Sequence, residues 1–174
     1  MLLDDTSSNV HDASFIPGTL VIMSRWLTEE EQRAWRGLLR MTSQLNARMN
    51  RQLLQEYGIS LTDYEVLVVL SEAPQGRLRV FEVADALAWE QSRVSHQLAR
   101  MQRRGLIARQ DCASDARGAF AVLTEAGRAA IERAAPAHVE TVRQLVFDGL
   151  SHDQLTALTE ITTGVLDRLE GEPD

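Results

Sequence analysis

Apolar side chains recur every three or four residues along most of the chain, and this period predicts a mainly helical protein. The longest run begins after Thr28 and includes Trp35, Leu38, Leu45 and Leu53 among its apolar positions, until Gly58 interrupts it. Thr28 is followed three residues later by Glu31, the pattern of a capping box at a helix start. The sequence therefore predicts one long amphipathic helix between Thr28 and Gly58.

Three shorter helical segments follow. The segment "LTDYEVLVVLSEAP" is expected to begin with a capping box of Thr62 and Glu65 and to stop at Pro74. The segment "RVFEVADALAW" places Val80, Val83, Ala84 and Leu87 on one face of a short helix, and "EQSRVSHQLARMQRRG" forms the next helix, which Gly105 ends.

The period then changes from 3.6 to about 2. "LIARQD" and "GAFAVLT" are typical of strands, and the polar turn "CASDARG" between them predicts a β-hairpin. Two more helices complete the chain: a segment in which Pro136 is expected to bend or split the helix, and a final helix capped by Ser151 with Gln154 three residues later.

The charge of the chain is unevenly distributed. Its 174 residues carry a formal net charge of -7, with 44% hydrophobic residues, enough for one good core. Between Arg77 and Arg117 eight arginines face five acids, a balance of +3, while the rest has ten arginines against twenty acids, or -10. A basic patch in an otherwise acidic protein is the electrostatic footprint of a nucleic-acid reader.

The basic patch is centred on the helix between Glu90 and Gly105. Val94, Leu98 and Met101 form a narrow apolar stripe on one side of it. The other side offers polar and cationic side chains of the kind that reach base edges and phosphates in a major groove: Ser92, His96, Arg100 and Arg103, with Arg93 flanking them. With the short helix before it, this segment predicts a helix-turn-helix, although a solvated outer face is the alternative for any polar helix.

The turn of the predicted hairpin carries Asp115 and Arg117, two residues apart. A carboxylate beside an arginine at a hairpin tip suits insertion of the guanidinium into a narrow minor groove, although an ordinary surface ion pair is the alternative. A helix-turn-helix followed by a basic hairpin is much more specific than either part alone, and it predicts a DNA-binding winged helix.

The order of elements, with "SRVSHQLARMQRRGLIAR" running into "DARGAFAVLTEAG", resembles the MarR family of winged-helix transcriptional regulators. The resemblance covers about residues 27–170, and its most specific part is the Asp-x-Arg pattern of Asp115 and Arg117 followed by "LTEAG". It implies a homodimer built from the first and last helices, a recognition helix in the major groove and a wing arginine in the minor groove of double-stranded DNA. The DNA-binding residues implied are Ser92, Arg93, Ser95, His96, Arg100, Asp115 and Arg117.

The flanking helices support dimerisation independently, since they carry more apolar side chains than a small winged helix covers: Leu145, Val146, Leu150, Leu155, Leu158, Ile161, Val165 and Leu169. An isologous dimer would cover them, and its two recognition helices, about 34 Å apart, would read an inverted repeat. The expected fold is mainly α with a small β-hairpin wing. Its parts are an N-terminal arm (1–24), a dimerisation helix (25–60), a winged helix-turn-helix lobe (61–123) and C-terminal dimerisation helices (124–174).

The family resemblance also implies a small anionic aromatic effector held between the dimer helices and the DNA-binding lobe. Trp35, Arg48, Tyr64 and Trp89 are candidates to line such a site, although each also suits a place in the core or interface. The regulator, a repressor or an activator, would then release or keep its operator according to the ligand.

Other chemistry is not expected from these residues. The single cysteine, Cys112, excludes an intramolecular disulfide, and it is read as an incidental thiol rather than a redox switch. The histidines are scattered without metal-ligand spacing, no nucleophile or phosphate-loop motif is present, and no apolar run reaches membrane-span length. We therefore expect a cytoplasmic protein that is not an enzyme and uses no cofactor; the rival hypothesis is a protein-interaction adaptor with this fold and no specific DNA binding.

Overall fold

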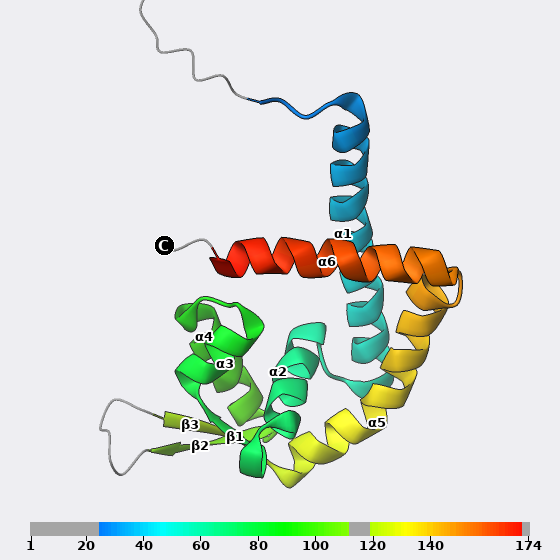
Figure 1. Cartoon of the computed structure of the whole chain (residues 1–174). Helices are drawn as coiled ribbons and strands as arrows, with labels where there is room; N and C mark the ends of the chain where they lie inside the picture. Colours follow the sequence, from blue (N-terminus) through cyan, green and yellow to red (C-terminus); the bar gives the residue numbers. More distant parts are fainter. Residues whose placement is uncertain (1–24, 112–118, 172–174) are drawn as a thin grey trace, which may run out of the picture. The chain divides into compact units, whose positions relative to one another are not determined.

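Residues 25–111 and 119–171 are described by a computed structural model of the chain (Figure 1). The chain divides into two units, residues 1–39 and 40–174. The described part of the first unit contains the beginning of helix α1. The second unit contains the rest of α1, all the other helices and the sheet.

Helix α1 spans Glu29–Tyr57, as the sequence predicts. The Thr28 N–H donates to the Glu31 carboxylate at 2.7 Å and the Glu31 N–H donates to the Thr28 hydroxyl at 3.2 Å, so this capping box is confirmed. These hydrogen bonds lower the pKa of the Glu31 carboxyl group from its usual value. Gly58 ends the helix with a φ of 67°, in the left-handed region that glycine adopts without strain.

Helix α2 (Leu61–Glu72) begins at a different cap from the one expected. The sequence prediction of Thr62 with Glu65 is wrong: Ser60 is the N-cap, and its hydroxyl accepts from the Asp63 N–H while the Asp63 carboxylate accepts from the Ser60 N–H at 2.8 Å. Ser60 has the extended backbone that an N-cap requires, whereas Thr62 already lies in the first helical turn.

The predicted helix-turn-helix is confirmed as α3 (Val80–Leu87) and α4 (Gln91–Arg103). The connection is short because Ala88 takes a left-handed conformation, with φ of 50°. The Trp89 N–H then donates back to the Ala84 carbonyl at 2.9 Å, which closes the end of α3 before α4 begins.

The hairpin strands β2 (Ile107–Asp111) and β3 (Ala119–Leu123) pair antiparallel, as predicted; the turn between them lies outside the described residues. A third strand, β1 (Arg77–Arg79), follows the short 3₁₀ turn η1 (Pro74–Gly76) and pairs with β3, so the order is β1-β3-β2. The sequence did not predict β1, because three residues directly before a helix show no periodicity.

Helix α5 runs from Glu125 to Val142 and includes Pro136, so of the two outcomes predicted for this proline, a bend or a split, the split is wrong. Alanines on both sides of Pro136 favour helix strongly enough to continue past one missing N–H donor. The regular helix ends later, at the π-helical turn η2 (Arg143–Phe147), and α6 (His152–Gly171) follows. The Ser151–Gln154 cap predicted for α6 is confirmed by both reciprocal hydrogen bonds.

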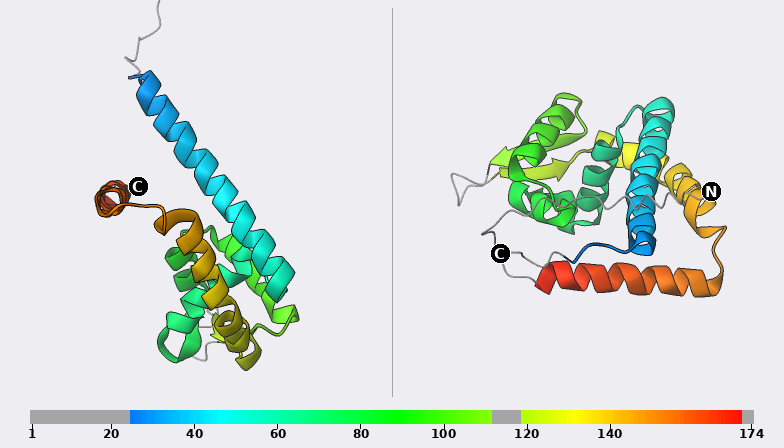
Figure 2. Two further views of the ribbon diagram at one scale, coloured as in Figure 1. Left: turned by 90° about the vertical axis from the view of Figure 1, so that its right-hand side faces the viewer. Right: turned by 90° about the horizontal axis from the view of Figure 1, so that it is seen from above.

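The core of the second unit gathers between α2, α3, α4, α5 and the sheet, with Leu53 from the end of α1. The right-hand view of Figure 2 shows α2, α3, α4 and the sheet close together. Val66, Leu67 and Leu70 of α2 are fully buried there. So is the predicted apolar stripe of α4, since Val94, Leu98 and Met101 each have 0% exposure. This packing fixes which face of α4 points outward.

Candidate nucleic-acid interface

The outward face of α4 carries the residues predicted to read DNA. Ser92, Arg93, His96 and Arg100 are exposed, and Ser95 is half-buried. The guanidinium of Arg93 lies over the Trp89 ring, 3.9 Å from its centroid, a cation–π contact that holds the arginine at the start of the helix.

A hollow of about 440 Å³ lies beside the first turn of α4, and we call it the arginine hollow. Arg79 and Arg109 line it together with Gln91 and Ser95 of α4. Two guanidinium groups and two neutral donors around one concave surface suit the phosphates of a nucleic-acid backbone. Sequence reasoning did not select Arg79, Arg109 or Gln91 for this site, because they come together only when the sheet packs on α4.

The sheet carries a further cationic feature. Arg77 and Arg79 of β1 both lie over the Phe120 ring of β3, each 5.3 Å from its centroid. The register, which pairs Arg79 with Phe120, explains why two alternate arginines both contact this one aromatic ring. Phe120 thereby supports the cationic side of the arginine hollow.

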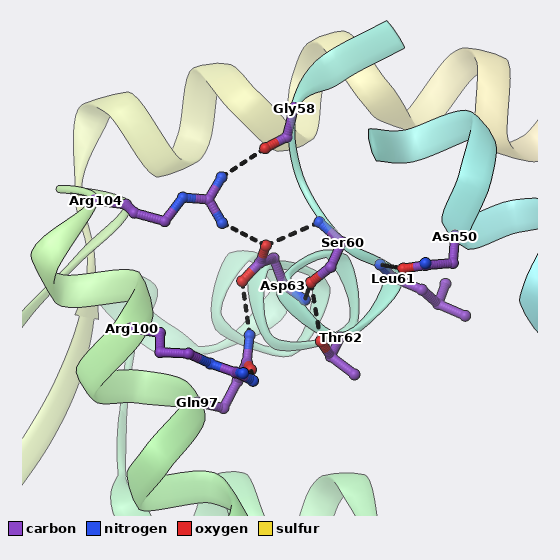
Figure 3. Close-up of polar contacts among 9 residues, drawn as sticks. All are labelled: Asn50, Gly58, Ser60, Leu61, Thr62, Asp63, Gln97, Arg100 and Arg104. Carbon is purple, nitrogen blue, oxygen red and sulfur yellow. Dashed lines mark hydrogen bonds and ion pairs between the residues drawn. The ribbon is translucent and has the colours of Figure 1, made fainter. Parts of the chain in front are cut away.

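The inward side of α4 is held by a network of polar contacts around Asp63 (Figure 3). Asp63 is 3% exposed, and its carboxylate accepts from Gln97 at 2.6 Å and from Arg104 at 2.6 Å. Arg104 also donates to the Gly58 carbonyl at 2.6 Å. The end of α1, the start of α2 and the middle and C-terminal end of α4 are therefore tied to one buried carboxylate.

Arg100 takes part in the same network, because its guanidinium donates to the side-chain oxygen of Gln97 (Figure 3). Gln97 in turn donates to Asp63, so one chain of hydrogen bonds leads from the buried carboxylate to an exposed arginine. Sequence reasoning missed Gln97 and Asp63, whose partnership spans 34 positions. On a helical wheel Gln97 falls beside the apolar stripe, but the wheel alone does not show that this polar side chain is buried.

The wing-tip residues Asp115 and Arg117, and also Cys112, lie outside the described residues. Their assignments as DNA-contacting residues and as an incidental thiol stay predictions.

A second hollow, lined mainly by α1 and α2, has a volume of about 290 Å³; we call it the His138 cavity. The Tyr64 and His138 rings lie 4.3 Å apart at its wall. The Nδ1 atom of His138 is buried and has no hydrogen-bond partner among the residues described. Its full lining is Asn46, Met49, Leu61, Tyr64, Glu65, Val68, Val69, Leu87 and His138.

Burial shifts the titration of all three ionisable groups of this cavity. It lowers the pKa of the His138 imidazole, and it raises the pKa of the Glu65 carboxyl group, an effect partly offset by the positive charge of Arg93. The pKa of the Tyr64 hydroxyl is raised by burial and by the charge of Glu72. In each case the low dielectric of the cavity favours the neutral form.

The candidate ligand residues of the second unit lie in different surroundings, and the assignment of all four stays a prediction. Tyr64 lines the His138 cavity, whereas Trp89 lines a separate hollow with Arg93, and Arg48 is exposed on α1. Trp35 belongs to the first unit, where it is 52% exposed. Glu65 and His138, which sequence reasoning did not associate with a ligand, are the polar groups that accompany Tyr64.

The described ranges, 25–111 and 119–171, contain neither a metal-binding cluster nor a membrane-spanning helix. No group of three or more His, Cys, Asp or Glu side chains there is arranged to hold a metal ion. No helix in these ranges is both long and apolar enough to cross a membrane.

A helix-turn-helix whose second helix buries an apolar stripe, followed by an antiparallel hairpin, defines a winged-helix DNA-binding protein. The family model described as MarR family matches residues 57–118. Together with the relatives below, this match shows that the chain belongs to the MarR family of transcriptional regulators, as the sequence resemblance implies.

Two solved structures from Streptomyces coelicolor are similar over nearly all of their length. AbsC, a MarR family transcriptional regulator, is 40% identical, with 86% of this chain and 100% of that chain covered and a TM-score of 0.79. Sco3205, a MarR family regulator solved in complex with DNA, is 42% identical, with 86% and 93% covered and a TM-score of 0.80. The mainly helical fold with a small sheet is confirmed by both.

A more distant relative is BpsR of Bordetella bronchiseptica, whose DNA binding is regulated by 6-hydroxynicotinic acid. It is 25% identical, with 76% of this chain and 98% of that chain covered and a TM-score of 0.66.

Proposed function

We propose that this transcriptional regulator is a repressor that binds a pseudo-palindromic operator as a homodimer and is released from it by a small ligand. The observation that carries the proposal is the orientation of α4. Its apolar stripe is fully buried, so Ser92, Arg93 and His96 face outward beside the arginine hollow. The DNA complex of the similar protein Sco3205 supports the same role for this chain.

Within this proposal the contacts divide into two kinds. Arg79 and Arg109 suit phosphate contacts, which supply affinity without reading sequence. Ser92, Arg93, Ser95, His96 and Arg100 on α4 would reach base edges in the major groove, and Arg117, with Asp115 beside it, would enter the minor groove.

The dimer would be built from the helices that flank the winged-helix lobe. α6 exposes large apolar side chains on one side, among them Ile161 at 64% and Leu169 at 68%. We assign dimerisation to residues 25–60 and 124–174 and DNA binding to residues 61–123; the predicted N-terminal arm, residues 1–24, lies outside the described residues. Two recognition helices about 34 Å apart would then read half-sites one DNA turn apart.

The test begins with selection of bound duplexes from random DNA, followed by fluorescence anisotropy titrations of the wild type, His96→Ala and Arg117→Ala. We expect an enriched inverted repeat, and a loss of about 1–3 kcal/mol for each substitution because each removes one specific contact. Matched controls are His152→Ala on α6 and Arg133→Ala on α5, which remove the same side-chain types from exposed positions away from α4.

Salt dependence separates this proposal from the adaptor alternative. A DNA reader loses affinity steeply as salt rises, because phosphate contacts release counterions. Failure to enrich any sequence, together with equal and weak binding by all five proteins, would indicate a protein-interaction adaptor instead.

Ligand release is supported by the His138 cavity, which offers a mostly apolar wall with a few polar groups. A ligand acts by binding the DNA-incompetent dimer geometry more tightly than the competent one. The regulation of BpsR by a small aromatic acid supports looking for an aromatic effector here.

A further inference from the structure

The His138 cavity has no cationic residue in its lining among the described residues. Its polar groups are the Glu65 carboxyl, the His138 imidazole, the Tyr64 hydroxyl and the Asn46 amide. Since burial lowers the pKa of His138, the imidazole is a neutral group rather than a partner for an anion. Among the described lining residues, Glu65 is therefore the one acidic group with which a cationic ligand could pair, and such a ligand would offset the effect of burial on its pKa.

The side chain of Glu65 has no hydrogen bond or ion pair within the part of the chain that the structure describes, although the residue is half-buried. Burial raises the pKa of the Glu65 carboxyl group and the positive charge of Arg93 partly offsets this, but the Arg93 guanidinium lies over the Trp89 ring and lines a different hollow. The Glu65 oxygens are not buried, unlike His138 Nδ1, so they reach solvent at the cavity wall and a ligand's donor can take the place of water there.

The remaining lining residues determine the size and the apolar, aromatic character of the ligand. Met49, Leu61, Val68, Val69 and Leu87 are apolar, and the Tyr64 and His138 rings present an aromatic wall. A volume of about 290 Å³ lies at the small end of ligand pockets, which span about 300–1,000 Å³. One ring or two fused rings with a short side chain suit this space.

We propose that the His138 cavity selects a small aromatic amine, with its protonated nitrogen at Glu65 and its ring against Tyr64 and His138, and discriminates against aromatic acids. This proposal rests on the proposed function of the cavity as an effector site and replaces the anionic ligand that the family resemblance implies. The orphaned Nδ1 atom of His138 supplies a second hydrogen-bonding group for the ligand.

The test uses three probes that share an indole ring and differ in the charge of the side chain: tryptamine, tryptophol and indole-3-acetate. Their affinities for the full chain, free of DNA, are measured by isothermal titration calorimetry. We expect tryptamine to bind about tenfold more tightly than indole-3-acetate, with tryptophol between them, since a partly screened charge pair gives a preference of this order.

Glu65→Gln tests the anchoring group, because the amide keeps the shape and removes the charge. The preference for tryptamine over indole-3-acetate should fall to about threefold or less in Glu65→Gln and stay unchanged in the control Glu132→Gln, which removes an exposed carboxylate of α5. Circular dichroism melts establish that both variants fold. Equal or tighter binding of the acid, no binding of any probe, or an unchanged preference in Glu65→Gln would each overturn the proposal.

DNA titrations of the same proteins without probe keep the two hypotheses separate. If the amine preference holds while no duplex is bound specifically, the cavity assignment stands and the repressor proposal fails. If an operator is bound but the acid is preferred, the repressor proposal stands and the ligand class is wrong.

Discussion

The carboxylate of Asp63 and the guanidinium of Arg104 lie 2.6 Å apart and join the first turn of α2 to the end of α4. The two side chains differ in environment, since 43% of the Arg104 side chain is exposed but only 5% of the Asp63 side chain. Asp63 also accepts from Gln97 and from the Ser60 N–H, so the buried carboxylate has donors on both oxygens. A fully bonded carboxylate at this point fixes the position of the recognition helix.

Asp63→Asn should lower the free energy of unfolding by about 2–3 kcal/mol, because the new amide places an N–H₂ group against existing donors and leaves Arg104 without its carboxylate. Urea denaturation followed by circular dichroism measures the change. Asp85→Asn, at an exposed position of α3, is the control and should stay within about 0.5 kcal/mol of the wild type. A similar small change for both variants would show that the network contributes little.

The network also shows where sequence reasoning stops. The stripe of Val94, Leu98 and Met101 was predictable, because helical periodicity alone determines which side chains share a face. The pairing of Asp63 with Gln97 was not, since it depends on how two helices pack across 34 residues. The cap at Ser60 was missed for a local reason. The sequence offers two overlapping capping patterns, Ser60 with Asp63 and Thr62 with Glu65, and Ser60 is the residue with the extended backbone of an N-cap.

The site was predictable to the same degree. Ser92, Arg93 and His96 follow from the helical wheel and lie on the exposed face expected. The arginine hollow did not follow, because Arg79 belongs to a three-residue strand that forms only by pairing with β3. Likewise, His138 is far from Tyr64 in the sequence, and only the packing of α5 on α2 brings the two rings together.

Gly127→Ala should destabilise the fold by about 2–4 kcal/mol through steric overlap. A Cβ atom at Gly127 would lie 2.1 Å from the Leu106 carbonyl oxygen and 2.8 Å from a Leu123 methyl carbon, so the backbone at the start of α5 would have to move. This close approach gives a physical reason for the glycine in "LTEAG". Gly149→Ala is the control, since no atom lies within 4 Å of its Cβ position. Thermal melts that coincide for the two variants would contradict the steric argument.

His138 should make the fold less stable in mildly acidic solution. Because burial lowers the pKa of His138, the unfolded chain binds a proton near pH 6.5 that the folded chain resists, and stability falls as the pH drops below about 6.5. Glu65 acts in the opposite direction, since burial raises its pKa, so the difference between variants is the useful quantity. Urea unfolding at pH 7.5 and 5.5 should show a smaller acid-induced loss in His138→Phe than in the wild type or in His152→Phe, whose histidine is exposed. Equal losses in all three would contradict the prediction.

The proposed dimer should depend on the apolar side of α6. Ile161 is 64% exposed, and an arginine at this position would place an unpaired charge in the interface. Ile161→Arg should raise the dimer dissociation constant more than tenfold, by about 1.4 kcal/mol or more, as measured by sedimentation equilibrium. Thr163→Arg, on the opposite side of the helix, adds the same charge and should leave the constant nearly unchanged. A dimer of wild-type strength in Ile161→Arg would move the interface elsewhere.

Trp89 should support operator binding without touching DNA, because its ring holds the Arg93 guanidinium at 3.9 Å. Trp89→Leu should weaken operator binding by about 0.5–1 kcal/mol, the usual contribution of an exposed cation–π contact. A double-mutant cycle with Arg93→Ala separates this effect from damage to the fold: if the ring acts through Arg93, the tryptophan substitution costs little once the arginine is gone. Additive losses in the double variant would mean that Trp89 and Arg93 contribute independently to operator binding. The cation–π contact would then not be the reason for the effect of Trp89→Leu.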